Sequence, residues 1–196
     1  MSRVRFAAKI IAPLEPKSIL DVGCRDAELA IYLPNAEYHG ADLFPGERVT
    51  YIGDITRMTI DRSFDAVVAC DILEHLDDPS LMFDRLLPLA ERHFLISLPN
   101  TYGLKSIAGM IRGDMGGKYR FTEEAPQDRH RWLMGRAEIH AFARAKAKKH
   151  RLALELFDLT YGSSGNQTMT AIGGRMLSAL LPRRFTTDTV FALFSR

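Results

Sequence analysis

Short apolar runs alternate with stretches of helical periodicity through the first hundred residues. The runs typical of strands lie at residues 18–22, 37–42, 49–52, 64–70 and 93–98. Apolar residues at helical spacing predict helices at residues 4–14, 27–33 and 78–90. Strands that alternate with helices predict βαβ units, so we expect a parallel sheet covered by helices on both faces.

The second half of the chain is less regular. Its pattern predicts helices at residues 105–111 and 136–149 and strands at residues 152–160 and 189–194. The glycine-rich, charged residues 113–118 are typical of an exposed loop. Residues 172–185 combine apolar residues with arginines, and core packing is the default interpretation. The alternative is an amphipathic element that covers a site, packs against another subunit or touches anionic lipid.

Composition excludes several classes of protein. Of 196 residues, 46% are hydrophobic and 26% are charged, which fits one compact domain rather than a disordered chain. Cys24 and Cys70 lie far apart without the spacing of a zinc site, so we expect reduced thiols in a cytoplasmic protein. The first residues lack the apolar core of a secretory signal, and no apolar run reaches the roughly 20 residues that span a bilayer.

Charge is unevenly distributed along the chain, although the net charge is only +2. Residues 1–100 hold 10 Lys/Arg and 16 Asp/Glu, which leaves −6, whereas residues 101–196 hold 16 and 8, which leaves +8. This asymmetry indicates that the two halves face ligands of opposite sign, although a solvated basic helix would account for part of it.

Acidic residues lie near the ends of three predicted strands. Gly23 follows the first strand, where it lets a ligand approach the backbone and the amino end of a helix beyond it. Asp42 ends the second strand, 21 residues after Asp21, where a carboxylate can accept both hydroxyls of a ribose. Asp54 follows the third strand and can accept the exocyclic amine of a purine. Each acid alone is more simply a cap or turn residue, but together they predict a nucleoside site.

The order and spacing of these motifs resemble those of the class I S-adenosylmethionine-dependent methyltransferases. The matching segments are Ile19–Cys24, Gly40–Asp42, Gly53–Ile55, Phe64–Leu76 with Asp78-Pro79, and Leu95–Asn100. The resemblance implies a three-layer Rossmann-like α/β sandwich, with a mostly parallel seven-stranded sheet and an antiparallel last strand. It also implies S-adenosylmethionine as cofactor and S-adenosylhomocysteine as product.

The resemblance further implies one methyltransferase domain over residues 1–196. Residues 1–100 form its cofactor-binding half, and residues 101–196 bind the acceptor and complete the sheet. The residues implied in cofactor binding are Asp21, Gly23, Cys24, Arg25 and Ala27 for the methionine moiety, Asp42 and Leu43 for the ribose, Asp54 and Ile55 for the adenine, and Cys70, Asp71 and Leu73 for the opposite wall.

The turn after the first strand departs from the family pattern. Three spaced glycines are usual there, whereas this Gly-Cys-Arg-Asp turn keeps only Gly23, with Arg25 and Ala27 at the other two positions. Arg25 brings a long cation beside a cationic sulfonium unless its side chain swings out or pairs with the methionine carboxylate. Weak cofactor binding and a noncatalytic cofactor- or partner-binding module with the same fold stay open as alternatives.

Polar and aromatic residues after the fifth strand are candidates for the acceptor side. His130 is the preferred general base, and His75 is the second candidate, although its Glu-His-Leu segment is better explained by holding a loop together. With Lys118 and Arg120, this segment suits a phosphate, a carboxylate or a nucleotide-linked sugar. The alternative is that its tryptophan anchors the loop and its arginines are solvated. The residues expected to bind substrate are Tyr119, Arg129, Arg131 and Trp132.

A metal site is the other chemistry weighed for this region. Asp71, Glu74 and His75 stand at positions i, i+3 and i+4 and resemble the cluster that gathers Mg²⁺ in some ubiquinone-pathway O-methyltransferases. Such ions need more oxygen ligands than this cluster supplies, so no metal is expected.

These observations predict an enzyme that methylates a small or carrier-linked anionic acceptor, at oxygen. Nucleic acid is not expected as a partner, because the basic run at residues 144–151 lacks interleaved aromatic residues. Peripheral contact with a membrane and the oligomeric state are left open. An oxidoreductase that uses a dinucleotide is disfavoured, because only one glycine of its phosphate-binding turn is present.

Overall fold

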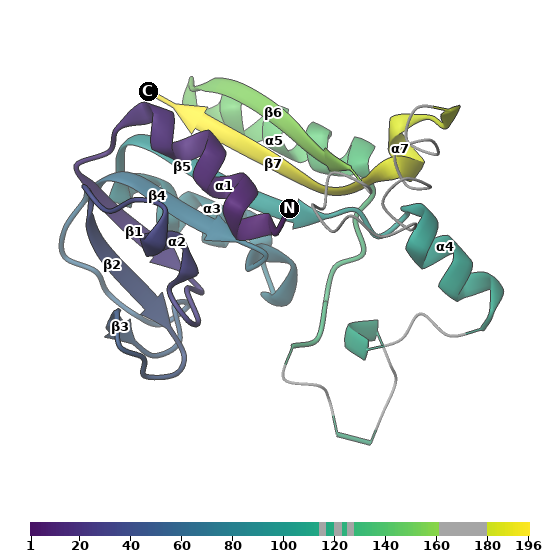
Figure 1. The fold of residues 1–196 in the computed structure, drawn as a ribbon, viewed down its shortest axis with the longest axis horizontal. Coiled ribbons are helices and arrows are strands. Elements are labelled where there is room, and N and C mark those ends of the chain that lie inside the picture. Colours follow the sequence, from purple (N-terminus) through teal and green to yellow (C-terminus); the bar gives the residue numbers. More distant parts are fainter. Residues whose placement is uncertain (114–116, 120–122, 125–127, 161–179) are drawn as a thin grey trace.

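The apolar runs of the sequence form one seven-stranded sheet in the computed structural model (Figure 1). The structure describes residues 1–113, 117–119, 123–124, 128–160 and 180–196, so Arg120 and residues 172–179 of the expected amphipathic element lie outside the described residues. The strands are β1 (Ser18–Val22), β2 (Glu37–Asp42), β3 (Val49–Ile52), β4 (Phe64–Cys70), β5 (Ala90–Pro99), β6 (Ala153–Thr160) and β7 (Thr187–Ser195).

The order of strands across the sheet is β3-β2-β1-β4-β5-β7-β6. β1 to β5 pair in parallel, whereas β7 runs antiparallel to both β5 and β6. The Rossmann-like sheet with an antiparallel last strand is therefore confirmed. Because parallel strands end on the same side, the carboxyl ends of β3, β2, β1 and β4 lie next to one another along one edge, which is where ligands of such sheets bind.

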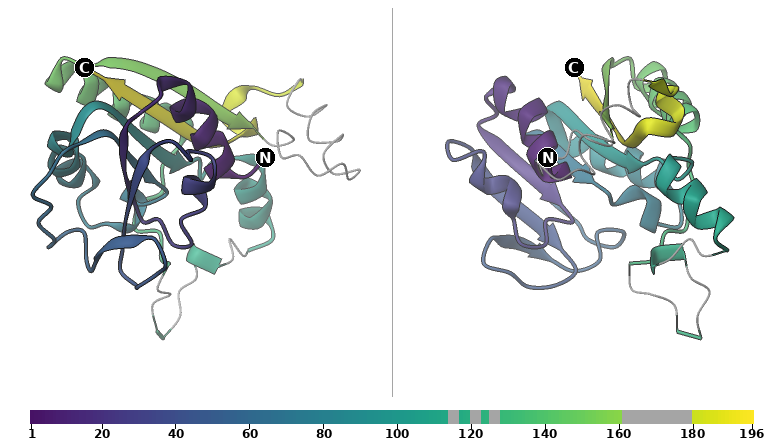
Figure 2. Two further views of the ribbon diagram at one scale, coloured as in Figure 1. Left: turned by 60° about the vertical axis from the view of Figure 1, so that its left-hand side comes forward. Right: turned by 45° about the vertical axis from the view of Figure 1, so that its right-hand side comes forward.

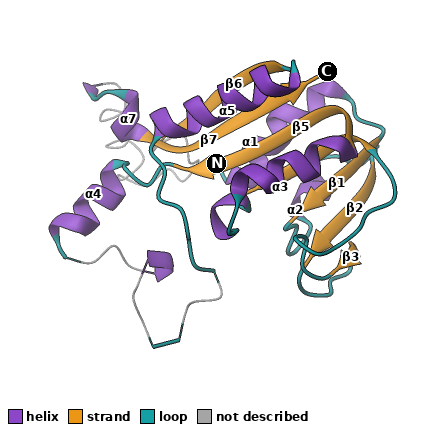
Figure 3. Ribbon diagram, turned by 180° about the vertical axis from the view of Figure 1, so that it is seen from behind, coloured by secondary structure: helices purple, strands orange, loops and turns teal. Residues whose placement is uncertain are grey.

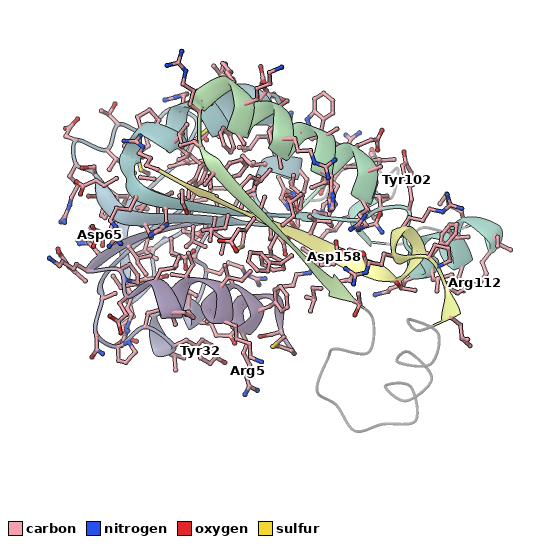
Figure 4. All side chains as sticks on the ribbon, turned by 90° about the horizontal axis from the view of Figure 1, so that it is seen from above. Arg5, Tyr32, Asp65, Tyr102, Arg112 and Asp158 are labelled. Atoms are coloured by element: carbon pink, nitrogen blue, oxygen red, sulfur yellow. The ribbon has the colours of Figure 1, made fainter. Side chains whose placement is uncertain are left out.

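Helices cover both faces of the sheet, which lies between α1 and α5 when seen edge-on (Figure 4). α1 (Arg3–Ile11) and α2 (Glu28–Ile31) lie on one face, and α3 (Pro79–Leu86) and α5 (Arg136–His150) lie on the other (Figure 3). α4 (Leu104–Ile111) and η4 (Gly117–Tyr119) lie beyond the end of β5, away from the sheet (Figure 2). The remaining short helices are η1 (Ala12–Leu14), η2 (Leu73–His75), η3 (Leu87–Leu89) and α7 (Arg183–Thr186).

Each face of the sheet has its own apolar core. Ala7 and Ile11 of α1 pack with Leu29 of α2 against one face. Phe83 of α3 and Ala143 of α5 belong to the cluster on the other face. This division explains why β1 and β4 are mostly apolar: their side chains are buried in both directions.

Several elements differ in length from the sequence prediction, and for three of them the structure shows the reason. α2 begins at Glu28 because Ala27 has a left-handed backbone conformation. α3 ends at Leu86, and Pro88 follows in η3, which is consistent with the lack of an N–H on proline and its poor fit inside a helix. β5 begins at Ala90, three residues before the predicted start, because it pairs with Phe64 at the start of β4.

Among the described residues, no helix is long and apolar enough to cross a membrane.

Candidate functional site

The turn after β1 has a left-handed backbone at three positions, only one of which is a glycine. Gly23, Arg25 and Ala27 all have positive φ angles, of 74°, 46° and 52°. A Cβ on Gly23 would lie 1.9 Å from Cδ1 of Ile72, so a side chain at this position is excluded unless Ile72 moves. The other two residues adopt the left-handed conformation despite their side chains, which costs free energy.

Arg25 contacts the next strand through its backbone rather than through its side chain. Its N–H donates to Oδ2 of Asp42 at 2.8 Å, and its side chain is exposed to solvent. Of the two arrangements considered from the sequence, the described structure therefore has the side chain swung out. Gly23 ties the same turn to β2, because its N–H donates to the carbonyl of Ala41 at 2.7 Å.

Asp42 stands at the end of β2 between two loops. Its Oδ1 accepts a hydrogen bond from the N–H of Phe44 at 3.2 Å, so each carboxylate oxygen is held by one backbone donor. A carboxylate can accept about four hydrogen bonds, which leaves room for two ligand hydroxyls. Leu43, the next residue, is exposed beside it.

The carboxylate of Asp54 accepts hydrogen bonds within the turn that follows β3. Its Oδ1 accepts hydrogen bonds from the N–H of Thr56 at 2.9 Å and from the Thr56 hydroxyl at 2.7 Å. These bonds lower the pKa of the carboxyl group, so the group is ionised at neutral pH. Ile55 is half-buried against the core. The hydrogen bonds within the turn already explain why an acid is found at position 54. The other carboxylate oxygen, Oδ2, lies 3.8 Å from Nε of Arg57.

Asp21 is buried beneath the turn. The hydroxyl of Tyr38 donates to its Oδ2 at 2.6 Å. Burial raises the pKa of Asp21 to about 7, and the Tyr38 hydrogen bond opposes that change in part. A cation beside this carboxyl group would favour its ionised form. Burial likewise raises the pKa of Cys24 to about 12, so its thiol stays protonated.

Asp71, which the sequence predicts on the opposite wall of the cofactor site, follows β4 immediately. Its φ angle of 55° is left-handed, and its Oδ1 accepts a hydrogen bond from the Ser97 hydroxyl at 2.9 Å. Arg3 of α1 reaches its Oδ2 at 2.7 Å and Asp188 of β7 at 3.3 Å. Arg3 therefore fastens α1 across this end of the sheet. No role in a site was predicted from the sequence for Arg3, Ser97 or Asp188.

The other two residues expected on this wall face inward. Leu73 is completely buried in the apolar core, so its side chain supports the wall from behind. Burial raises the pKa of the Cys70 thiol well above its usual value. Both cysteines are free in the structure.

A buried polar cluster follows the Asp71 wall. Glu74 has no exposed surface, and its Oε1 lies 3.8 Å from Nε2 of His75 and 4.0 Å from Nε2 of His130. The two imidazole rings meet edge to face, with centroids 4.7 Å apart. Sequence spacing placed Glu74 and His75 together, but only the fold adds His130, which lies 55 residues beyond His75.

Both groups at the centre of this cluster have displaced pKa values. Burial, followed by the nearby charge of Asp71, raises the pKa of Glu74 to about 8. Burial, followed by the charges of His75 and Lys118, lowers the pKa of His130 to about 4. At neutral pH the imidazole of His130 is therefore uncharged and carries a lone pair.

The segment at residues 128–132 is held against residues 74–77. The N–H groups of Arg131 and Trp132 donate to the carbonyl of Glu74 at 2.9 and 3.3 Å. The indole N–H of Trp132 donates to the carbonyl of Leu76 at 2.9 Å, and the Arg131 side chain pairs with Asp77. Trp132 thus anchors the segment, as the alternative interpretation of the sequence proposed.

Two other residues expected to bind substrate contact the cluster directly. The hydroxyl of Tyr119 lies 3.1 Å from Nδ1 of His130. The carbonyl of Arg129 accepts a hydrogen bond from Nδ1–H of His75 at 3.0 Å, while the Arg129 side chain is exposed. Asn100, which sequence reasoning did not single out, links this region to the sheet: its Oδ1 accepts from the N–H of Arg136 at 3.1 Å.

The sequence and the fold can be compared with those of known proteins. Residues 2–153 match a family described as a methyltransferase domain. No curated protein matches the sequence.

Three solved structures share the fold at low identity. The small RNA methyltransferase HEN1 is 18% identical with a TM-score of 0.67, and the match covers 99% of this chain and 25% of that one. The plantazolicin methyltransferase BpumL, in complex with a monoazolic desmethylPZN analog and SAH, is 16% identical with a TM-score of 0.60 over 98% of this chain and 81% of that one. The magnesium protoporphyrin IX methyltransferase ChlM from Synechocystis PCC 6803, with bound SAH, is 17% identical with a TM-score of 0.57 over 98% and 82%.

Proposed function

This chain belongs to the methyltransferase-domain family, and from that membership we propose that it transfers a methyl group from S-adenosylmethionine to the oxygen of a small or carrier-linked anionic acceptor. The observation that carries the proposal is the row of acids along one edge of the sheet. Asp54, Asp42 and Asp21 belong to β3, β2 and β1 or the turns after them, and these strands are neighbours in that order. Two of the structural relatives were crystallised with SAH.

The residues present fit this cofactor. Adenine, ribose and methionine follow one another along S-adenosylmethionine, and the acids follow one another along the sheet edge in the matching order. The cofactor supplies an activated methyl group on a cationic sulfur. In this proposal Asp42 accepts the ribose hydroxyls, while Asp21 and the turn at Gly23 face the methionine end. Asp54 receives the adenine amine.

The variant turn is compatible with this role. Arg25 and Ala27 keep left-handed φ angles, and the exposed side chain of Arg25 leaves the turn free of a buried cation. This observation favours a working cofactor turn over the alternative of a noncatalytic module. The Arg25 side chain, if it folds back, would pair with a carboxylate rather than with the sulfonium.

The acceptor side supports transfer to oxygen. A hydroxyl acceptor must lose a proton, and the buried cluster around His130 holds an uncharged imidazole close to the Asp71 wall. Lys118 and Arg129 lie next to the cluster and favour an anionic acceptor, although Lys118 is engaged with Asp128 at 2.6 Å. His130 and His75 remain the proposed catalytic residues.

Calorimetry with purified protein tests the cofactor assignment. We expect S-adenosylmethionine and S-adenosylhomocysteine to bind, and Asp42→Ala to weaken both by at least about tenfold, roughly 1.4 kcal/mol, because the ribose hydrogen bonds are lost. Asp61→Ala removes an exposed acid outside the site and serves as the matched control. Binding of neither compound would favour the noncatalytic module, and binding of a reduced nicotinamide cofactor instead would favour an oxidoreductase.

A further inference from the structure

We propose that Glu74, His75 and His130 form a binding site for a first-row transition-metal ion that holds the acceptor oxygen. The inference rests on the proposed function for its chemistry, but the site itself rests on geometry alone. One ligand atom from each residue can be chosen so that all three lie within 4.8 Å of one another. A single ion in their midst would reach all three.

The ligand atoms of Glu74 and His130 are buried and have no hydrogen-bond partner among the described residues. Among the described residues, neither side-chain oxygen of Glu74 has a hydrogen-bond partner, and neither does Nε2 of His130. Glu74 is 0% exposed, and the His130 side chain is 4% exposed. Buried carboxylates are normally paired or bound to a metal, because burial without a partner is costly. A cation between Oε1 of Glu74 and Nε2 of His130 would satisfy both.

The outer nitrogens of both histidines are held in the way that metal-binding histidines require. Nδ1–H of His75 donates to the carbonyl of Arg129 at 3.0 Å, which leaves the lone pair on Nε2, the atom nearest Glu74. Nδ1 of His130 lies 3.1 Å from the Tyr119 hydroxyl, and its Nε2 also faces Glu74. Such outer contacts fix the ring orientation of metal-binding histidines.

The donor set selects the kind of ion. Two imidazoles and one carboxylate suit zinc, manganese, iron or cobalt, whereas Mg²⁺ prefers oxygen ligands. In the sequence, the candidate ligands were Asp71, Glu74 and His75, and they are too few for a hard ion. In the structure Asp71 is instead engaged by Arg3 and Ser97, and His130 takes its place. Asp128 lies 3.3 Å from Nε2 of His75 and stands ready as a fourth ligand or a neighbouring base.

A metal at this position changes the role of His130. An ion with an open coordination position binds the acceptor hydroxyl and lowers its pKa, so the proton leaves to solvent without a strong base. The oxygen then forms the bond to the methyl carbon as the bond from carbon to sulfur breaks, and the sulfur keeps that electron pair. His130 is in this scheme a ligand that positions the acceptor, because its lone pair cannot also accept a proton.

Metal titration of the purified, chelator-treated protein tests the site without any acceptor. Calorimetry with Zn²⁺, Mn²⁺, Co²⁺ and Mg²⁺ should show one site that binds at least one of the first three about tenfold or more tightly than Mg²⁺. The visible absorption of Co²⁺ should report nitrogen ligation. His130→Gln and Glu74→Gln should each weaken binding by about tenfold or more. His39→Gln, which changes a histidine on β2, should leave binding unchanged.

Two further measurements keep the result decisive. Circular dichroism establishes that each variant is folded, and His75→Ala serves if either buried variant is not. Equal binding by all variants, or no binding by the unaltered protein, overturns the proposal. Titration of the same samples with S-adenosylhomocysteine separates the two hypotheses: if it binds and the metals do not, only the metal site fails, and the reverse result defeats the proposed function alone.

Discussion

Arg25 and Ala27 adopt a backbone conformation that glycine adopts at no steric cost. Their φ angles are 46° and 52°, and the hydrogen bond from Arg25 N–H to Asp42 holds the backbone of Arg25 in place. A left-handed non-glycine residue costs of order 1 kcal/mol or more. The protein therefore holds strain at the point where the cofactor is proposed to bind.

Replacing Arg25 with glycine should stabilise the protein. We expect Arg25→Gly to raise the free energy of unfolding by up to about 1 kcal/mol, because glycine has no Cβ to strain the left-handed turn, although its flexible unfolded state offsets part of the gain. Urea unfolding measures the change. Arg144→Gly in the middle of α5 is the matched control and should have the opposite sign, with a loss of about 1 kcal/mol. A loss of stability in Arg25→Gly would show that the turn is not strained.

Among the helices, α3 and α5 are joined by a single carboxylate. Asp84 of α3 accepts hydrogen bonds from Lys146 at 2.7 Å, from Lys149 at 2.6 Å and from His150 at 2.8 Å. Burial alone would raise the pKa of Asp84, but the three hydrogen bonds outweigh it and hold the pKa well below its usual value. The Lys146 side chain is buried and also donates to the carbonyl of Ser80 at 2.7 Å.

Neutralising this carboxylate should loosen the pair of helices. At pH 7 we expect Asp84→Asn to lower the free energy of unfolding by about 1–3 kcal/mol, because Lys146 is left buried without its counter-charge. The folded-state pKa is depressed, so the contribution is present above the usual carboxyl pKa of 3.8 and is lost as the pH falls below it. Denaturant unfolding of both proteins at several pH values should show the difference narrowing in acid.

The exposed partner of Asp84 provides the control. Lys149→Ala removes a side chain that is 59% exposed, so its effect should stay below about 1 kcal/mol. An equal loss in both variants would mean that burial of Lys146 does not set the strength of this contact.

The strands were predictable because each is a short apolar run bounded by turn residues. β1 to β4 begin and end at the predicted residues. In β1 and β4 burial on both faces leaves a mostly apolar run, whereas β2 and β3 are less buried and are recognised by the turn residues that follow them. The exact length of α2 was not predictable, because it depends on a left-handed Ala27 that propensity does not favour.

The candidate site was likewise predictable from the sequence only in part. The acids at the strand ends were found from the sequence, because sheet topology fixes where a strand end lies. The approach of His130 to Glu74 was not, because it depends on how the chain between β5 and α5 returns to the sheet. That return is fixed by backbone hydrogen bonds, such as the one from Trp132 N–H to Glu74, which carry no sequence signature.

Folding brings charged residues of the acidic half of the sequence into contact with charged residues of the basic half. Several cations of residues 101–196 pair with acids of residues 1–100. Arg3 is the reverse case, because it is a cation of the first half that pairs with Asp188 of the second half. Among the described residues, a lysine or arginine of residues 101–196 pairs with an acid of residues 1–100 in three cases: Lys146 and Lys149 with Asp84, and Arg131 with Asp77. The charge difference between residues 1–100 and 101–196 therefore serves partly to hold the fold together, and the charge of the acceptor has to be inferred from the residues beside His130.

The described contacts also favour one cooperative unit. Trp132 is the only tryptophan and is hydrogen-bonded to Leu76, so its fluorescence reports on the segment at residues 128–132, while far-ultraviolet circular dichroism reports on the sheet and helices. We expect both signals to change in one coincident thermal transition, and S-adenosylhomocysteine to raise both midpoints equally. An earlier change in fluorescence would mean that the segment around Trp132 unfolds separately and that residues 1–196 are not one cooperative domain.

The position of β7 between β5 and β6 sets an order for folding during synthesis. Within the described structure β6 pairs only with β7, and β7 is made after both of its neighbours. When residues 153–160 have left the ribosome, β6 therefore has no partner strand, and the edge of β5 that will pair with β7 is still open. Closing the sheet then joins Ser195 to His93, 102 residues earlier in the chain. Such distant pairings close slowly, so the nascent protein passes through a stage with two unpaired strand edges that chaperones or early contacts must protect.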